Sequence, residues 1–175
     1  MKAGKPLMAL LLIAGVLFAG DKPQIGDPAP TFFLRTLEGD TFFLSRQVGA
    51  QASPENRRPM VLSFFATWCI PCKAEIPVLH QMQAAHPQVR FYLVNVEEQS
   101  ELVKKYVAAN DISLPVLMDM YSVVAKKYGI VNNENVAVLP QLVLVDAAGN
   151  LVYAHEGYQA GDELELQETL QKLLR

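Results

Sequence analysis

The chain has 175 residues, a length that fits one domain with a full hydrophobic core. Hydrophobic residues make up 51% of it and charged residues 19%, a globular balance that excludes an extended disordered protein. The formal net charge of −3 does not provide the clustered basic charge that nucleic acids require, so no nucleic-acid partner is expected.

The N-terminus has the pattern of an export signal. Two lysines precede an uncharged apolar run, Leu7–Gly20, which ends at Asp21. The run is shorter than the roughly 20 residues of a membrane span but suits the core of a signal peptide. Bulky residues stand where a cleavage site prefers small ones, so an uncleaved signal anchor stays open. We expect a signal peptide or anchor at residues 1–20, a domain at residues 21–175, and a location in the periplasm or at the outer face of the inner membrane.

The rest of the chain predicts a hairpin followed by alternating strands and helices. The hairpin strands are expected at residues 31–36 and 41–44, around a Glu-Gly-Asp turn. Further strands are expected at residues 60–66, 89–96, 115–118, 141–145 and 150–155. Helices are expected at residues 73–86, 100–110, 121–128 and 164–174. Pro77 is expected to kink or restart the first of these helices.

This order of elements predicts an α/β fold. The strands at residues 60–66 and 89–96 are apolar almost throughout, as central strands covered on both faces are. Parallel crossovers followed by an antiparallel pair give a mixed central sheet flanked by helices, with the N-terminal β-hairpin as an extension.

The only two cysteines lie in the segment Trp68-Cys69-Ile70-Pro71-Cys72, at a predicted strand–helix junction. An exported protein with one closely spaced pair is not a disulfide-stapled scaffold, because such scaffolds carry several bridges. The small loop between the cysteines also adds little stability. We therefore expect a working disulfide. Cys69 is the expected exposed nucleophile, its thiolate favoured by the helix dipole, and Cys72 the buried resolving thiol.

A zinc site is the rival interpretation of this cysteine spacing. His80 and His86 follow in the pattern C-x2-C-x7-H-x5-H, whose central gap is shorter than the roughly 12–15 residues of a zinc finger. At this separation on a helix the two imidazoles point about 240° apart and cannot face one ion. We expect no metal, and we expect His80, His86 and His155 at the surface.

Residues 64–79, FFATWCIPCKAEIPVL, resemble the active-site segment of thioredoxin-fold proteins, and more narrowly of the TlpA/ResA-like thiol–disulfide oxidoreductases that bacteria export. Residues 26–32, GDPAPTF, resemble the lead-in of the related redoxin and peroxiredoxin branch. Residues 139–146, LPQLVLVD, resemble the strand that follows the cis-proline of the family. The likeness runs from about Gly26 to the C-terminus and implies a thioredoxin-like fold with dithiol–disulfide exchange.

The resemblance implies roles for both cysteines and for one glutamate. Cys69 would attack the substrate disulfide, and Cys72 would resolve the mixed disulfide. Ser63 stands where classical thioredoxins place a buried aspartate, so that proton acceptor is missing. Glu75 matches the glutamate of the TlpA/ResA-like group and, when buried, would take the proton of Cys72. The alternative for Glu75 is an ordinary solvated helix glutamate.

The resemblance also implies a set of substrate-binding residues. Pro140 would be the cis-proline facing the disulfide, although trans is the default from spacing alone, since only about 5–6% of X–Pro bonds are cis. Leu139 would contact the substrate chain, and Trp68 would cover a flank of the disulfide unless it is an ordinary core aromatic. Ile70 and Pro71 complete the expected set.

The function implied by the resemblance is an extracytoplasmic thiol–disulfide oxidoreductase for protein substrates, of the reductase type that serves cytochrome c maturation. We expect a monomer that is kept reduced by a membrane electron donor, and no cofactor besides the Cys69–Cys72 disulfide. An oxidant or isomerase would carry the same residues, so the direction stays open. The loop at residues 131–139 is longer and more polar than in most relatives, and we expect it to alter the choice of partner.

Two other functions remain as alternatives. A thiol peroxidase of the peroxiredoxin branch needs the motif Pro-x-x-x-Thr/Ser-x-x-Cys, but Leu62 and Ala66 stand at its first two positions here. A non-enzymatic binding or chaperone domain would use the groove beside Pro140. The presence of both cysteines argues against that alternative.

Overall fold

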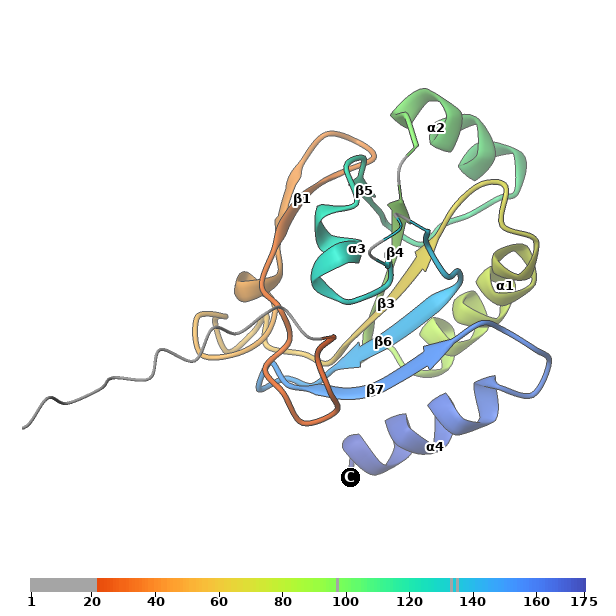
Figure 1. Cartoon of the computed structure of the whole chain (residues 1–175). Helices are drawn as coiled ribbons and strands as arrows, with labels where there is room; N and C mark the ends of the chain where they lie inside the picture. Colours follow the sequence, from red (N-terminus) through yellow and green to blue (C-terminus); the bar gives the residue numbers. More distant parts are fainter. Residues whose placement is uncertain (1–21, 97, 133, 135) are drawn as a thin grey trace, which may run out of the picture.

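Seven strands of the described chain form one mixed sheet (Figure 1). The computed structural model describes residues 22–175 except 97, 133 and 135, so the signal segment expected at residues 1–20 lies outside them. The strands are β1 (Phe33–Thr36), β2 (Thr41–Phe43), β3 (Met60–Phe65), β4 (Arg90–Val96), β5 (Val116–Asp119), β6 (Gln141–Val145) and β7 (Leu151–Glu156). Their spatial order is β2-β1-β5-β4-β3-β6-β7. The predicted α/β fold with a mixed central sheet is confirmed.

The three central strands are parallel, and the outer strands are antiparallel to their neighbours. β3 pairs with β4 and β4 with β5 in parallel, whereas β6 and β7 add to the β3 side in antiparallel pairs. The N-terminal hairpin extends the opposite side, because β1 pairs antiparallel with β5. The hairpin is therefore part of the sheet.

Four helices accompany the strands in the described chain. They are α1 (Ile70–Ala85), α2 (Ser100–Ala109), α3 (Val123–Lys127) and α4 (Glu163–Leu173), with a short 3-10 turn at Leu44–Arg46. The helix expected from residue 73 begins at Ile70, because Pro71 fits the first turn, where its missing N–H has no intrahelical partner to lose. The expected restart at Pro77 is wrong, since α1 continues through it. Pro77 and Lys73 lie at exposed positions, where water can replace the lost hydrogen bond.

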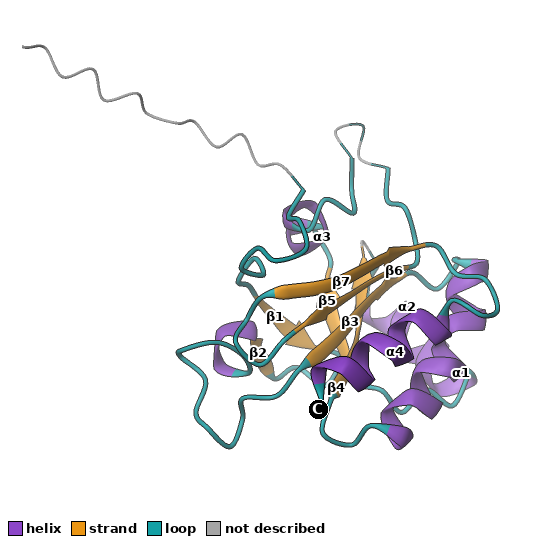
Figure 2. Ribbon diagram, turned by 90° about the horizontal axis from the view of Figure 1, so that it is seen from below, coloured by secondary structure: helices purple, strands orange, loops and turns teal. Residues whose placement is uncertain are grey.

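Helices lie on both faces of the sheet (Figure 2), and each face carries its own hydrophobic core. On one face, the side chains of β3, β4 and β6 pack against α1, α2 and α4, and this core includes Cys69 and Cys72. On the other face, α3 and the segment around the hairpin cover the same strands, and Tyr128 and Phe42 belong to this second core. Among the described residues, none of the helices has both the length and the apolar character needed to cross a membrane.

The topology brings two distant segments of the sequence to one edge of the sheet. β3 ends at Phe65, and the chain then turns into α1. β6 runs antiparallel to β3, with Gln141 opposite Phe64, so the start of β6 lies beside the end of β3. The cysteine segment and the Leu139–Pro140 segment are therefore neighbours at this edge.

Candidate active site

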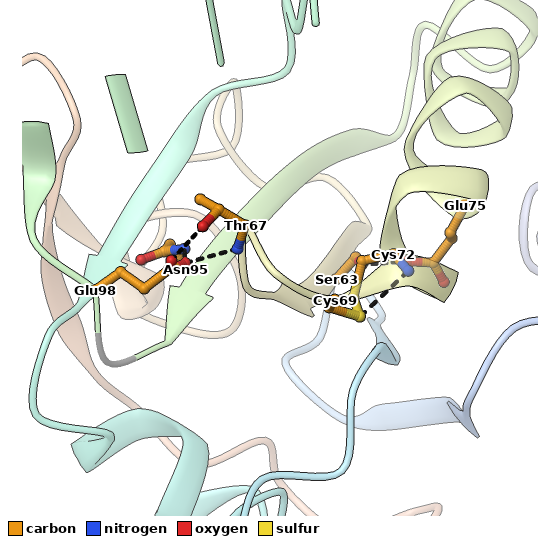
Figure 3. The surroundings of a disulfide bond; sticks show 7 residues. All are labelled: Ser63, Thr67, Cys69, Cys72, Glu75, Asn95 and Glu98. Carbon is orange, nitrogen blue, oxygen red and sulfur yellow. Dashed lines mark hydrogen bonds between the residues drawn. A yellow bond between two sulfur atoms is a disulfide. The ribbon is translucent and has the colours of Figure 1, made fainter. Parts of the chain in front are cut away.

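Cys69 and Cys72 form a disulfide at the N-terminus of α1 (Figure 3). The S–S distance is 2.02 Å and the Cα atoms are 5.3 Å apart. Cys69 is the N-cap residue of the helix, and the backbone N–H of Cys72 donates a hydrogen bond of 3.2 Å to its Sγ. After reduction, this N–H and the positive end of the helix dipole would both favour the thiolate of Cys69 over that of a solvated cysteine.

The expected exposure of Cys69 is wrong for the disulfide form. Cys69 is only 3% exposed, whereas its neighbours Trp68 and Ile70 are 66% and 79% exposed. The cause is the bond to Cys72, which turns the Cys69 side chain into the first helical turn and towards the core. Trp68 is thus not a core aromatic. The surface beside the disulfide consists of the side chains that flank Cys69 rather than of its sulfur.

Glu75 lies one helical turn after Cys72 and is buried, with 3% of its surface exposed. The hydroxyl of Ser63 on β3 donates a hydrogen bond of 2.6 Å to Oε2 of Glu75. Burial raises the pKa of Glu75 from 4.5 to about 7, and the Ser63 hydrogen bond opposes part of that rise. The alternative of a solvated glutamate is therefore wrong. A carboxyl group with this pKa can take up and release a proton near neutral pH.

The Leu139–Pro140 peptide bond is cis, as the resemblance implies. Pro140 is buried, and its carbonyl oxygen accepts a hydrogen bond of 2.8 Å from the N–H of Gly157. Leu139 is partly buried and packs against both cores. The hydrogen bond to Gly157 and this packing hold the segment at the edge of the sheet where the disulfide lies.

The described part of the loop before the cis-proline is held by hydrogen bonds within the loop. Val131 pairs with Ala137 in an isolated bridge, and the N–H of Val138 donates to the carbonyl of Ile130 over 3.1 Å. The side chain of Asn132 accepts hydrogen bonds from the backbone N–H groups of residues 134 and 136. Val136 and Val138 are exposed. The loop thus adds two apolar side chains to the surface close to Leu139.

A second buried glutamate, Glu98, was missed by the sequence analysis. Its Oε2 accepts hydrogen bonds from the backbone N–H of Thr67, at 2.7 Å, and from Nδ2 of Asn95, at 2.6 Å. The Thr67 hydroxyl donates to Oε1 (Figure 3). Because Thr67 directly precedes Trp68, Glu98 ties the turn that carries Cys69 to the end of β4. The available signal was Asn95, a polar residue within an apolar strand, followed three positions later by the glutamate.

The three histidines lie in separate, half-buried places. Nε2 of His80 accepts a hydrogen bond from the backbone N–H of Ser113, and His86 follows the end of α1. His155 is hydrogen-bonded to Asp162, so its expected place on the open surface is only partly correct. Within the described residues, no three His, Cys, Asp or Glu side chains form a group that could hold a metal ion.

A hollow of about 590 Å³ lies away from the disulfide. It is lined by β1, β2, the end of β5 and α3, with Phe33, Tyr121 and Val123 among its exposed apolar residues. None of the predicted site residues lines it. The predicted site residues therefore lie away from this hollow, and the disulfide lies at the sheet edge.

Comparisons with known proteins identify the family of this chain and its relatives. The model of the AhpC/TSA family matches residues 25–154. Thiol-disulfide oxidoreductase ResA from Bacillus thuringiensis is 28% identical over 164 residues, which cover 93% of this chain and 86% of the relative. Sporulation thiol-disulfide oxidoreductase A from Bacillus subtilis is 26% identical over 91% of each chain.

Solved structures of the same kind share the fold. A putative thiol:disulfide interchange protein DsbE from Chlorobium tepidum has a TM-score of 0.74 and 26% identity, covering 87% of this chain and 99% of its own. A secreted Mycobacterium tuberculosis disulfide oxidoreductase, homologous to DsbE, has a TM-score of 0.64 and 26% identity, covering 81% and 96%. The chain therefore belongs to the AhpC/TSA family and is a thiol–disulfide oxidoreductase with a thioredoxin-like fold.

Proposed function

We propose that this oxidoreductase reduces disulfides in other proteins outside the cytoplasm, with Cys69 as the attacking thiol and Cys72 as the resolving thiol. The observation that carries the proposal is the Cys69–Cys72 disulfide at the start of α1, one turn from the buried Glu75. The names of the relatives support the general activity. The dithiol itself holds the two electrons of the reaction, so no further cofactor is needed.

The proposed reaction has two exchange steps. First, the Cys69 thiolate attacks one sulfur of the substrate disulfide, which breaks the substrate S–S bond and forms a mixed disulfide. Next, the Cys72 thiolate attacks Sγ of Cys69, the Cys69–Cys72 bond forms, and the second substrate sulfur leaves. The substrate gains two electrons and takes two protons to become a dithiol. A membrane electron donor then returns two electrons and two protons to the disulfide.

Glu75 is the proposed proton acceptor for Cys72. The second step requires a thiolate, but Cys72 is fully buried, and burial disfavours the charged form of a thiol. Glu75 lies one turn along the same helix and has a pKa raised to about 7, so its carboxylate can accept the Cys72 proton at neutral pH. The alternative acceptor at the thioredoxin position is absent, since Ser63 stands there.

The proposed substrate surface surrounds the disulfide. Trp68 and Ile70 are the exposed apolar side chains on either side of Cys69, and Pro71 is also exposed. Leu139 and Pro140 lie on the neighbouring chain segment at the same sheet edge. An extended protein segment can therefore contact both sides of the disulfide.

The location and physiological partner are also proposals. The apolar run at residues 7–20 supports export, and one similar solved protein is described as secreted. We propose a monomer in the periplasm or held at the outer face of the inner membrane by its N-terminus, acting in cytochrome c maturation. A thiol peroxidase is not proposed, because the positions of its required Pro and Thr are held by the buried apolar residues Leu62 and Ala66.

The test combines a measurement of the reduction potential with the trapping of mixed disulfides between this protein and its substrates. The Cys72→Ser variant is expected to accumulate mixed disulfides with substrate proteins through Cys69, while Cys69→Ser, the matched control, forms none. The potential of the wild-type pair is expected near or below the roughly −270 mV of thioredoxin. A value near the roughly −120 mV of a strong oxidant would overturn the reductase assignment. Equal trapping by both variants would overturn the assigned order of the two cysteines.

A further inference from the structure

Glu75 needs a route by which its proton reaches water. The residue is almost fully buried, and its side-chain hydrogen-bond partner among the described residues is Ser63, which is buried as well. If Glu75 takes the proton of Cys72, that proton must then leave Glu75, because otherwise it returns to the Cys72 thiolate before the thiolate attacks the mixed disulfide. A direct path through Ser63 leads into the sheet rather than to the surface, because Ser63 lies on the central strand β3.

The register of the sheet places a histidine on the same face as Glu75. Ser63 on β3 lies opposite Leu142 on β6, and Leu142 lies opposite His155 on β7. Residues directly paired across neighbouring strands point to the same face of a sheet. Ser63 contacts Glu75 on this face, so His155 lies on the face that α1 covers. Two strand spacings separate His155 from Ser63, a distance of about 10 Å.

A small cavity lies between these groups. It has a volume of about 20 Å³, and its lining includes Glu75, Leu142, His155, Tyr158 and Asp162. A cavity needs at least roughly 10–15 Å³ and some polar partners to hold a water molecule. Glu75 and His155, whose side chains end in polar groups, are two of the residues that line this cavity. The space and the chemistry therefore suit one bridging water.

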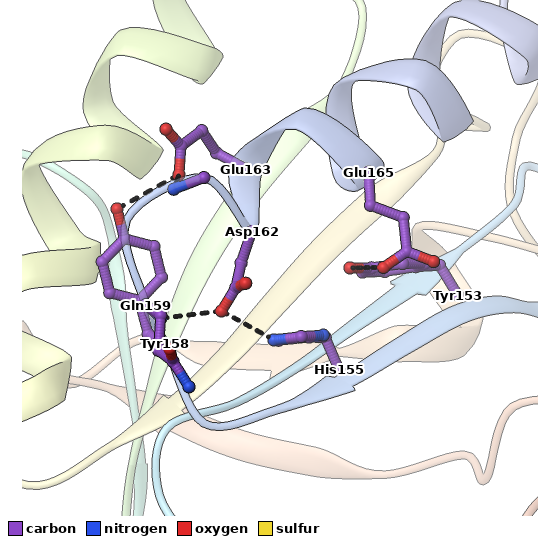
Figure 4. A network of polar contacts seen from close by, with 8 residues as sticks. Tyr153, His155, Tyr158, Gln159, Asp162, Glu163 and Glu165 are labelled. Atoms are coloured by element: carbon purple, nitrogen blue, oxygen red, sulfur yellow. Dashed lines mark hydrogen bonds and ion pairs between the residues drawn. The ribbon is translucent and has the colours of Figure 1, made fainter.

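His155 is held by a carboxylate at the protein surface (Figure 4). Nε2 of His155 lies 3.0 Å from Oδ2 of Asp162, and the N–H of Gln159 donates to the same oxygen over 2.7 Å. A carboxylate only accepts hydrogen bonds, so Nε2 of His155 carries a hydrogen and Nδ1 is the nitrogen free to take a proton. Both side chains of the pair are partly exposed, which gives His155 access to bulk water.

We propose that His155, held by Asp162, passes the proton of Glu75 to solvent through the small cavity that all three residues line. The inference rests on the proposed role of Glu75 in the reductase reaction. The proton moves from the Cys72 thiol to the Glu75 carboxylate, then through the bridging water to Nδ1 of His155. The imidazolium, stabilised by Asp162, releases it to bulk water. No electron moves in this sequence, and Glu75 and His155 return to their starting states.

The other titratable groups around Glu75 and His155 do not replace His155 as the proton acceptor near neutral pH. The other titratable groups on this side of Glu75 and His155 come from β7, α4 and the loop before α4. They are Tyr153, Tyr158, Asp162, Glu163 and Glu165. Burial raises the pKa of both tyrosines, so they stay protonated. Backbone hydrogen bonds lower the pKa of Asp162 and Glu163, so they stay charged.

The experiment measures the two exchange steps separately. The reduced protein is mixed with excess of an aromatic disulfide that releases a coloured thiolate. The first release reports the attack by Cys69 and depends on reagent concentration, whereas the second reports the attack by Cys72 on the mixed disulfide and does not. Both rates are measured from pH 5 to 9 for wild type, His155→Gln and Asp162→Asn. His80→Gln is the matched control, since His80 is a half-buried histidine that lies outside the cavity.

We expect His155→Gln to slow the second release about tenfold near neutral pH, since the relay is one step removed from a general base that contributes roughly 100-fold or more. The first release should not change, and His80→Gln should match wild type in both. In His155→Ala, added imidazole should restore the second rate, which a purely structural role would not allow. Asp162→Asn should slow the second release less than His155→Gln does.

Three outcomes would overturn the inference. The first is an unchanged second release in His155→Gln, while Glu75→Gln slows it. The second is a slowing that imidazole does not restore in His155→Ala. The third is an equal slowing in His80→Gln. A failure of the proposed function looks different, because then Glu75→Gln leaves the second release unchanged or Cys69→Ser leaves the first unchanged.

Discussion

Glu75 and Glu98 are two buried glutamates on the two sides of the redox motif, and their surroundings differ in the number of hydrogen-bond donors (Figure 3). Glu98 receives three donors, the N–H and hydroxyl of Thr67 and the amide of Asn95. Glu75 receives one donor, the hydroxyl of Ser63. The same residue type therefore accepts three hydrogen bonds on the side of the motif where Thr67 lies and one hydrogen bond on the other side.

The difference separates a structural carboxylate from a proton carrier. A carboxylate surrounded by donors holds those donors in place and rigidifies the segments that carry them. A desolvated carboxylate with few donors gains stability when it is protonated, so it can exchange a proton at neutral pH. Glu98 accordingly holds the turn that leads to Cys69, and Glu75 is suited to serve Cys72. Substituting each glutamate tests this division.

The largest expected effect is the pH dependence of stability that Glu75 causes. Burial raises its pKa to about 7 in the folded disulfide form, from 4.5 in the unfolded chain. The folded protein therefore holds a proton that the unfolded chain releases, and this stability is present below pH 4.5 and lost as the pH rises through 7. The loss amounts to about 3 kcal/mol. Urea denaturation of the oxidised protein between pH 4.5 and 8 measures it.

Glu75→Gln is the matched variant for that measurement, because glutamine has the same shape and does not titrate. The difference in unfolding free energy between variant and wild type should grow with pH and level off above pH 7. Other titrating groups are common to both proteins and cancel in the difference. Parallel stability curves for the two proteins would show that Glu75 does not carry a raised pKa.

The second largest effect concerns Glu98, whose substitution should lower the free energy of unfolding and leave the exchange chemistry of Cys72 unchanged. Glu98→Ala leaves the Thr67 N–H and the Asn95 amide as buried donors without their partner, and we expect a loss of about 2 kcal/mol. Glu98→Gln keeps one oxygen for these donors and should lose about half as much. Denaturation at pH 7 measures both losses. In Glu98→Gln the pH midpoint of the Cys72 exchange rate should stay as in wild type; a shift like that of a Glu75 variant would end the distinction between the two glutamates.

The fold and the cysteine pair could be predicted from the sequence because both depend on local patterns. The buried strands are continuous apolar runs, and the strand–helix junction is marked by the cysteines and by Pro71. The burial of Cys69 could not be predicted, since it depends on the direction that its side chain takes to reach Cys72. The expected helix restart at Pro77 was wrong for a related reason, because the effect of a proline depends on whether water can reach the carbonyl that loses its hydrogen bond.

The polar partners around the motif could not be predicted because they depend on register. Ser63 could be recognised as a departure from thioredoxin, but its contact with Glu75 requires the placement of α1 over β3. The hydrogen bonds of Glu98 with Thr67 and Asn95 join the turn after β3 to the end of β4, and these two segments are about 30 positions apart in the sequence. His155 meets Glu75 at one cavity only through the pairing of β3, β6 and β7. Such contacts follow from tertiary structure and leave only single polar residues as signals.

The smallest expected effect comes from Ser63, whose hydrogen bond adjusts the pKa of Glu75. Its hydrogen bond lowers the pKa of Glu75 against the larger effect of burial. Ser63→Ala should therefore move the pH midpoint of the Cys72 exchange upward, by less than about one pH unit, because a single neutral hydrogen bond contributes roughly 1 kcal/mol. The same substitution in the Glu75→Gln background provides the control and should move nothing. A shift that persists in that background would mean that Ser63 acts on the disulfide by a route other than Glu75.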